Sequence, residues 1–116
     1  MLERGRVGQS WRGRWDSFCL VTPNWTIRLP GGGYEGDDPD GYLPRDRVVE
    51  HLERYAASYG APVREGVEVT SLETTRSGRF ALRTTVGEIH ARTVVVSTGA
   101  YQRPHRPPAA WCRDRR

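Results

Sequence analysis

The stretch Val94-Val95-Val96-Ser97-Thr98-Gly99-Ala100-Tyr101 decides which fold the rest of the sequence predicts. Three consecutive β-branched residues are typical of a strand buried on both faces, as in parallel sheets. The Ser-Thr-Gly-Ala that follows consists of small residues, which let the backbone pass close to another group. Open α/β sheets bind their ligands at the end of such a strand. A core strand followed by an ordinary loop would have the same sequence, so these residues alone leave both interpretations open.

A helix and a group of short strands are predicted before this stretch. Apolar residues recur at helical spacing over about 45–59 and indicate one amphipathic helix, which a proline starts and a glycine ends. On its outer face, Glu50 and Arg54 are expected to pair, and His51 is expected to face solvent.

From residue 63 the apolar period changes to two, with turn signals between the apolar runs. This pattern predicts a three-stranded antiparallel meander over about 66–92. The meander leads into the buried parallel strand, over about 93–97. One helix, a meander and a buried parallel strand indicate an α/β fold class.

The length and composition limit what the chain can be. It has 116 residues, room for one domain at most, and 13 glycines and 8 prolines predict much loop around a thin core. No apolar run is long enough to cross a membrane, and the N-terminus lacks the apolar segment of a secretory signal. Cys19 and Cys112 form no CxxC pair, so we expect a reducing cytoplasm, no structural disulfide and no metal cluster.

The net charge of +4 comes entirely from arginine, because the sequence has no lysine. This excludes a P-loop lysine and a Schiff-base lysine. Arginine suits bidentate contacts with phosphate or carboxylate, although most of these arginines are expected to be ordinary surface cations. Arginines gather towards both ends of the chain, which leaves nucleic-acid binding as an alternative. An acidic middle and the lack of a basic helix or finger motif weigh against it.

The first 16 residues combine flat apolar rings with anion donors. Trp11 and Trp15 stand among four arginines, which suits a ligand that carries both rings and phosphates; a flexible arm is the alternative. Leu2-Glu3 looks like the end of a strand. Residues 17–43 show little periodicity and are expected to form loop.

Short motifs follow one another along the chain: Leu2-Glu3-Arg4-Gly5, Gly8-Gln9-Ser10-Trp11-Arg12, Arg14-Trp15-Asp16, Thr22-Pro23, Asp46, Tyr55-Ala56, Val69-Thr70 and Ser97-Thr98-Gly99-Ala100. In this order and spacing they resemble the flavin-containing monooxygenase family, above all its bacterial flavoprotein members. The resemblance covers roughly residues 2–108. Each motif is weak alone, whereas the ordered set is fairly specific.

The resemblance implies a Rossmann-type FAD-binding domain whose sheet is interrupted by a β-meander. In such a domain Glu3 would hold the adenosine ribose, and the backbone of Val69 would meet the adenine edge. Arg12 or Arg14 would offset the pyrophosphate charge. The implied cofactor-binding residues are Glu3, Arg4, Gly8, Ser10, Trp11, Arg14, Trp15, Asp16, Val69, Thr98, Gly99 and Ala100.

The sequence also departs from the family pattern. The GxGxxG motif of the family lies about 20 residues before the ribose acid, which here would place it before Met1. The second glycine motif, for NADP, is not found. We therefore expect residues 1–108 to be a partial FAD-binding domain without its first βα unit, followed by an irregular tail over 109–116.

The function implied by the resemblance is that of a fragment of an FAD-dependent, NADPH-using monooxygenase with a small-molecule substrate. No catalytic side chain is expected, because the cofactor would carry the chemistry. Neither a metal nor a membrane nor nucleic acid is expected as a partner. Alone, the chain is expected to be marginally stable, inactive and a weak binder of FAD at best. The alternatives are a non-enzymatic remnant of a truncated or frameshifted gene and, less favoured, a basic binding module.

Overall fold

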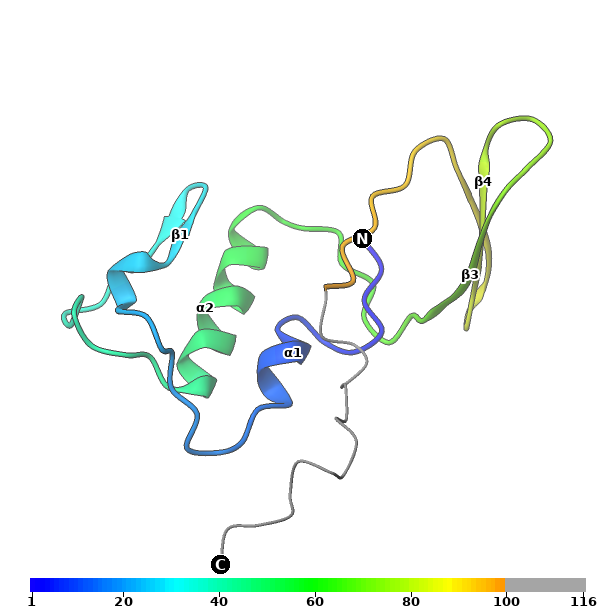
Figure 1. Ribbon diagram of the computed structural model, residues 1–116. Coiled ribbons are helices and arrows are strands. Elements are labelled where there is room, and N and C mark those ends of the chain that lie inside the picture. The colour runs from blue at the N-terminus through cyan, green and yellow to red at the C-terminus, as the bar shows by residue number, and fades with distance from the viewer. Residues whose placement is uncertain (100–116) are drawn as a thin grey trace, which may run out of the picture.

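The computed structural model describes residues 1–99, and residues 100–116 lie outside the described part. Figure 1 shows the helices and a small hairpin in one half and a separate sheet in the other. In chain order the elements are α1 (Gln9–Arg12), a 3-10 turn η1 (Asn24–Thr26), β1 (Arg28–Leu29), β2 (Gly32–Gly33), α2 (Arg45–Ser58), β3 (Val69–Thr74), β4 (Phe80–Thr84) and β5 (Gly87–Ala91).

Helix α2 confirms the helix predicted over 45–59. Pro44 precedes its first turn, and Asp46 lies within that turn, where a carboxylate faces the positive end of the helix dipole. Val48 and Val49 are buried. Val49 lies against Gly8, the residue before α1, so the apolar face of α2 packs on the N-terminal segment.

The outer face of α2 differs from the prediction in two ways. Glu50 pairs with Arg47, with 2.7 Å between Oε2 and Nη1, rather than with Arg54. The two partners lie three residues apart and therefore share a face of the helix. His51 is half-buried rather than solvent-facing, and its Nε2 is buried without a hydrogen-bond partner in the described structure.

The three-stranded antiparallel meander predicted over 66–92 is confirmed by strands β3, β4 and β5, which pair in that order. Leu82 on the central strand is its buried residue. The first turn is closed by Thr75, whose amide donates to the carbonyl oxygen of Arg79 at 2.7 Å, and Gly78 supplies a φ of 76° there. A register shift between Val69 and Ser71 marks a bulge at the start of β3.

The buried parallel strand predicted over 93–97 does not form. Residues 93–99 have no regular structure, and Val95 and Val96 are 83% and 66% exposed. A parallel strand is stable only between neighbouring strands that share its hydrogen bonds and cover its faces. Every strand pair in the described part of the chain is antiparallel, so this run of valines has no sheet to join.

The loop predicted over 17–43 contains more structure than expected. Strands β1 and β2 form a small hairpin around Gly31, which has a φ of 70°. The hydroxyls of Tyr55 and Tyr59, on and just after α2, both donate to the carbonyl oxygen of Pro30. These side chains come from a distant segment, so a local pattern in the sequence could not indicate the hairpin.

The N-terminal residues run beside residues 62–67. Leu2 forms an isolated parallel bridge with Arg64, and the amide of Glu3 donates to the carbonyl oxygen of Arg64 at 3.0 Å. The amide of Val67 donates to the carbonyl oxygen of Glu3 at 3.0 Å. Leu2-Glu3 therefore has strand-like pairing, as the sequence suggested.

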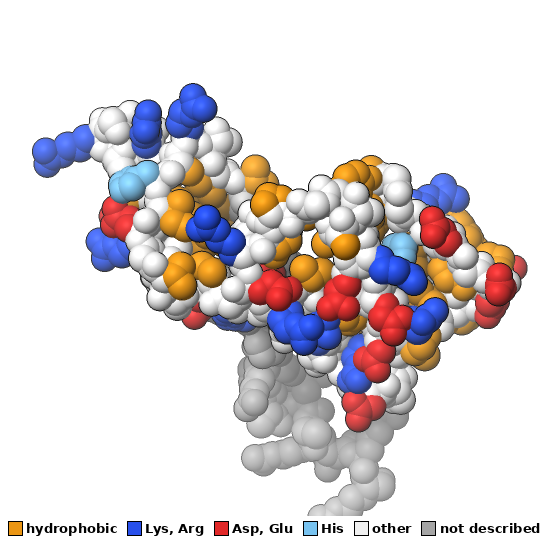
Figure 2. Space-filling view, turned by 180° about the vertical axis from the view of Figure 1, so that it is seen from behind, with side chains coloured by type: hydrophobic (Ala, Val, Ile, Leu, Met, Phe, Trp, Pro, Cys, Tyr) orange, Lys and Arg blue, Asp and Glu red, His pale blue; other side chains and the backbone are white. Residues whose placement is uncertain are grey.

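The described part of the chain is extended and encloses little core. Its radius of gyration is 18.8 Å, against about 13 Å for a compact domain of about 100 residues. Within the described residues, the buried hydrophobic side chains are Val48, Val49, Val67 and Leu82. Figure 2 shows hydrophobic side chains exposed between charged ones over both halves of the molecule. In the described part of the chain, the strands of the sheet pack mainly on one another and α1 packs on α2, so the sheet and the helices share little core.

Candidate cofactor-binding site

An apolar hollow of about 220 Å³ lies between the N-terminal loop and α2. Glu3 and Gly8 line it, together with Leu52 and Tyr55 of the helix. The Oε1 of Glu3 accepts a hydrogen bond from the amide of Gly5 at 2.8 Å. Its Oε2 makes no hydrogen bond within residues 1–99. One carboxylate oxygen is thus fixed, and the other can accept from a ligand hydroxyl.

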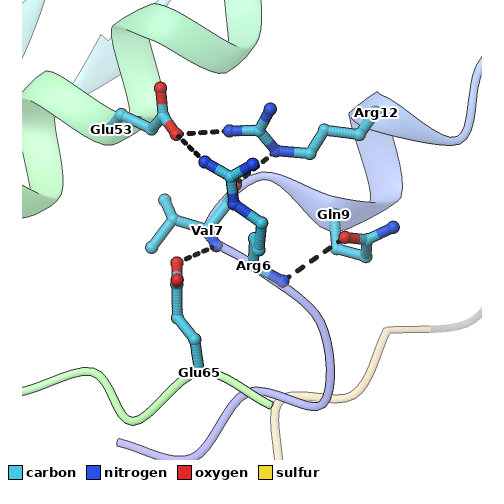
Figure 3. A network of polar contacts seen from close by, with 6 residues as sticks. All are labelled: Arg6, Val7, Gln9, Arg12, Glu53 and Glu65. Carbon is cyan, nitrogen blue, oxygen red and sulfur yellow. Dashed lines mark hydrogen bonds and ion pairs between the residues drawn. The ribbon is translucent and has the colours of Figure 1, made fainter.

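The loop that leads into α1 is held against α2 by a polar network (Figure 3). Glu53 of α2 accepts contacts from the guanidinium groups of Arg6 and Arg12. The Nε of Arg12 donates to the carbonyl oxygen of Val7 at 3.2 Å, and Glu65 accepts from the amide of Val7 at 2.8 Å. Arg12 is therefore engaged within the protein, which leaves Arg14 as the more available of the two predicted pyrophosphate partners.

Gly8 makes the sharp turn at the start of α1. Its φ is 75°, which favours glycine, and a Cβ at this position would lie 3.6 Å from the side chain of Val49. The turn brings the loop backbone close to α2 beside Glu3. A side chain here would strain the backbone at the rim of the hollow.

An aromatic cluster follows α1. The ring of Phe18 packs 5.7 Å from Trp11 and 5.2 Å from Trp15 between ring centroids, and the guanidinium of Arg14 lies 5.7 Å from the centre of the Phe18 ring. Trp15 is 62% exposed. The cluster presents an open indole face beside a cation, a combination that can stack on a planar ring and contact an anion.

Arg45, at the start of α2, fixes the loop that carries Arg14, Trp15 and Asp16. Its Nη1 donates to the Arg14 carbonyl oxygen at 3.0 Å and to Asp16 Oδ1 at 2.7 Å, while its Nε donates to Asp46 Oδ1 at 2.8 Å. Hydrogen bonds with Asp46 and Asp16 raise the pKa of Arg45, and the hydrogen bond from Arg45 lowers the pKa of Asp46. The Asp16 carboxylate, predicted to lie near the flavin, is thus oriented by Arg45.

The remaining predicted residues lie apart from the hollow's lining. Arg4 forms a loose ion pair with Glu68 at 3.8 Å, and Ser10 is exposed in α1. Val69 is 41% exposed at the start of β3. Thr98 and Gly99 lie in the irregular segment after β5, which runs back towards the N-terminal half in Figure 1. Ala100 falls outside the described residues.

The structure adds residues that the sequence did not single out. Arg45, Glu53 and Glu65 each contact the N-terminal loop from more than 25 positions away. The sequence offered no signal for these pairings, because ion pairs between distant segments have no periodicity. Within residues 1–99, no group of three or more metal-ligating side chains is found, and no helix is long and apolar enough to cross a membrane.

A carboxylate-bearing loop, a long helix and a β-meander make up the described part of an α/β fold. The model of the pyridine nucleotide-disulphide oxidoreductase family matches residues 1–113, and the chain belongs to this family. An "uncharacterized oxidoreductase CzcO-like" from Geobacillus kaustophilus is 40% identical over 108 residues, and a CzcO oxidoreductase from Bacillus subtilis is 30% identical over 101 residues. The matches cover 93% and 87% of this chain but 30% and 29% of these relatives.

Solved structures agree with this assignment. A flavin-containing monooxygenase from Stenotrophomonas maltophilia superposes with a TM-score of 0.75 at 25% identity, over 85% of this chain and 30% of that one. A bacillithiol disulfide reductase from Staphylococcus aureus superposes with a TM-score of 0.77 at 15% identity, over 86% of this chain and 30% of that one. The predicted α/β class and the resemblance to an FAD-dependent monooxygenase-like fragment are confirmed.

Proposed function

We propose that this chain forms part of the FAD-binding domain of an NADPH-using monooxygenase that acts on a small-molecule substrate in the cytoplasm. The observation that carries the proposal is the carboxylate of Glu3, with one oxygen held by the Gly5 amide and the other available at the rim of the hollow. A ribose offers neighbouring hydroxyls to such a carboxylate. The flavin-containing monooxygenase among the structural neighbours supports the cofactor assignment.

Each part of the surface has a role in this proposal. Glu3 accepts from a ribose hydroxyl, the Arg14 guanidinium offsets phosphate charge, and the exposed ring of Trp15 borders the flavin. Arg45 keeps the loop of Arg14 and Asp16 in place. FAD, when bound, supplies the redox chemistry, and this chain supplies binding and orientation rather than a catalytic side chain.

The described part of the chain is too open to retain the cofactor by itself. The hollow beside Glu3 is walled only by the N-terminal segment and residues of α2 and the loop after it, and Val95 and Val96 have no sheet around them. We therefore propose that the isolated chain binds FAD weakly or not at all and has no activity. The same exposed valines also fit a non-enzymatic remnant of a broken gene.

A chimera tests the proposal and separates it from the remnant. The 108-residue stretch of this chain that matches the Geobacillus kaustophilus relative replaces its counterpart in that relative, which is 40% identical there. The purified chimera is expected to contain FAD, detected by its absorbance and by release on denaturation. A chimera that folds without flavin would favour the remnant, provided that the parent relative carries flavin.

The role of Glu3 is tested in the same chimera. Glu3→Gln keeps the size of the side chain but removes the charge, and it is expected to lower the FAD content or affinity about tenfold, since a hydrogen bond to a charged group contributes about 1.5–3 kcal/mol. Glu73→Gln is the matched control, because Glu73 is exposed on the sheet and makes only a loose ion pair at 3.8 Å. Equal flavin loss in the two variants would contradict the role of Glu3.

A further inference from the structure

A second hollow, of about 190 Å³, lies between α2 and the segment after β2. Arg47, His51 and Arg54 line it from the helix, and Tyr34 and Glu35 line it from the facing segment. None of these residues belongs to the surface proposed for FAD. A ligand in this hollow would therefore not compete with FAD for the same side chains.

The three helical residues form one nitrogen-rich face. They follow at spacings of four and three residues, which places them on the same side of an α-helix. The apolar residues of α2 are on the other side, where Leu52 and Tyr55 line the first hollow. The helix thus separates an apolar hollow from a basic one.

The donors on this face are only partly used. The Nη1 of Arg47 donates to Oε2 of Glu50 at 2.7 Å, which leaves the other nitrogens of the planar guanidinium available as donors. The side chain of Arg54 makes no ion pair or hydrogen bond within residues 1–99. The Nε2 of His51 is buried and lacks a hydrogen-bond partner in the same part of the chain. Buried polar atoms are almost always paired, so an orphaned one indicates a missing partner.

We propose that this hollow binds a small oxyanion, a carboxylate or phosphate group carried by a low-molecular-weight ligand. Arginine forks match the geometry of both groups. The volume of the hollow is several times that of a single water molecule, so a group of several atoms fits in it. Glu35 on the facing wall repels negative charge, so the site favours a singly charged group over a polyanion.

Binding is tested on the whole chain by following the ring resonances of His51 in NMR spectra at constant ionic strength. Inorganic phosphate and acetate serve as the two probes, and the lower dissociation constant identifies the preferred group. We expect a saturable shift with a dissociation constant in the millimolar range, weakened about tenfold in Arg54→Gln. The helical signal in the circular dichroism spectrum of each variant shows whether α2 still forms. If Arg54→Gln loses this signal, Arg47→Gln is used in its place.

The matched control is Arg76→Gln. Arg76 lies in the exposed turn between β3 and β4 and makes no ion pair in the described structure. Unchanged affinity in this variant, with weakened affinity in Arg54→Gln, supports the site. A shift that does not saturate in the unmodified chain, or an equal loss in both variants, overturns it.

Discussion

The guanidinium of Arg45 lies 2.7 Å from the carboxylate of Asp16, 29 residues earlier, and thereby joins the first turn of α2 to the loop after α1. The same side chain also reaches the Arg14 carbonyl oxygen and Asp46. The Arg45 amide donates to the carbonyl oxygen of Phe18 at 2.9 Å. One residue thus positions the segment that carries the exposed Trp15 ring.

Arg45→Gln is expected to release this segment. The variant loses the side-chain contacts with Asp16 and Asp46, so the Trp15 loop gains freedom and the unfolding midpoint falls by a few degrees. Tryptophan fluorescence and thermal denaturation measure the two effects. Arg79→Gln, at an exposed turn of the meander, serves as the control. A midpoint that falls equally in both variants would show that Arg45 has no special role.

Stability is expected to depend on pH through Asp46. The hydrogen bond from Arg45 lowers the pKa of the Asp46 carboxyl in the folded chain. A carboxyl of this kind adds stability above its unfolded pKa of about 3.9, and this stability is lost as the pH falls through the lower folded pKa. Denaturation midpoints measured below about pH 4 should therefore fall more steeply in the unmodified chain than in Asp46→Asn. Parallel curves would contradict this assignment.

Tyr59→Phe is expected to lower the pKa of Tyr55. Burial raises the pKa of Tyr55, and the hydrogen bond and charge interaction with Tyr59 raise it further. Removal of the Tyr59 hydroxyl removes its two contributions, while burial still raises the pKa, so the titration midpoint of Tyr55 falls towards its ordinary value of about 10 but stays above it. Ultraviolet difference titration measures the shift, with Tyr42→Phe as the exposed control. No difference between the variants would show that the two hydroxyls act independently.

Leu82→Ala is expected to lower the free energy of unfolding of the meander. Leu82 is 8% exposed on the central strand, and truncation of a buried leucine costs about 2–5 kcal/mol, here at the lower end because few side chains in the described part of the chain are buried with it. Circular dichroism on denaturant titration measures the loss. Val86→Ala, 66% exposed in the turn before β5, should change stability by less than about 0.5 kcal/mol.

Substitution of the exposed Val95 is expected to have opposite effects in this chain and in the chimera. Val95→Asp should leave the stability of this chain nearly unchanged, because the side chain is 83% exposed. In the chimera with the Geobacillus kaustophilus relative, the same substitution should prevent folding if the 93–97 segment joins a buried strand there, since a charge would enter an apolar core. Soluble yield and thermal denaturation measure both. A chimera that tolerates the aspartate would show that this segment forms no core strand.

Local patterns in the sequence determined the helix over Arg45–Ser58, the meander over Val69–Ala91 and the family. Periodicity, turn residues and ordered motifs act over short distances, so they can be seen without coordinates. The β1–β2 hairpin was missed because its anchors are tyrosine hydroxyls of a distant segment. The pairing of Arg45 with Asp16 was missed for the same reason.

Tertiary structure alone decided the state of Val94-Val95-Val96. The sequence predicts that these residues form a buried strand, yet β-branched side chains form such a strand only when neighbouring strands pair with it and cover it. No strand of residues 1–99 does so, and the run stays irregular and largely exposed. The local sequence determines the preference for a strand, whereas neighbouring strands in the tertiary structure determine whether that strand is buried.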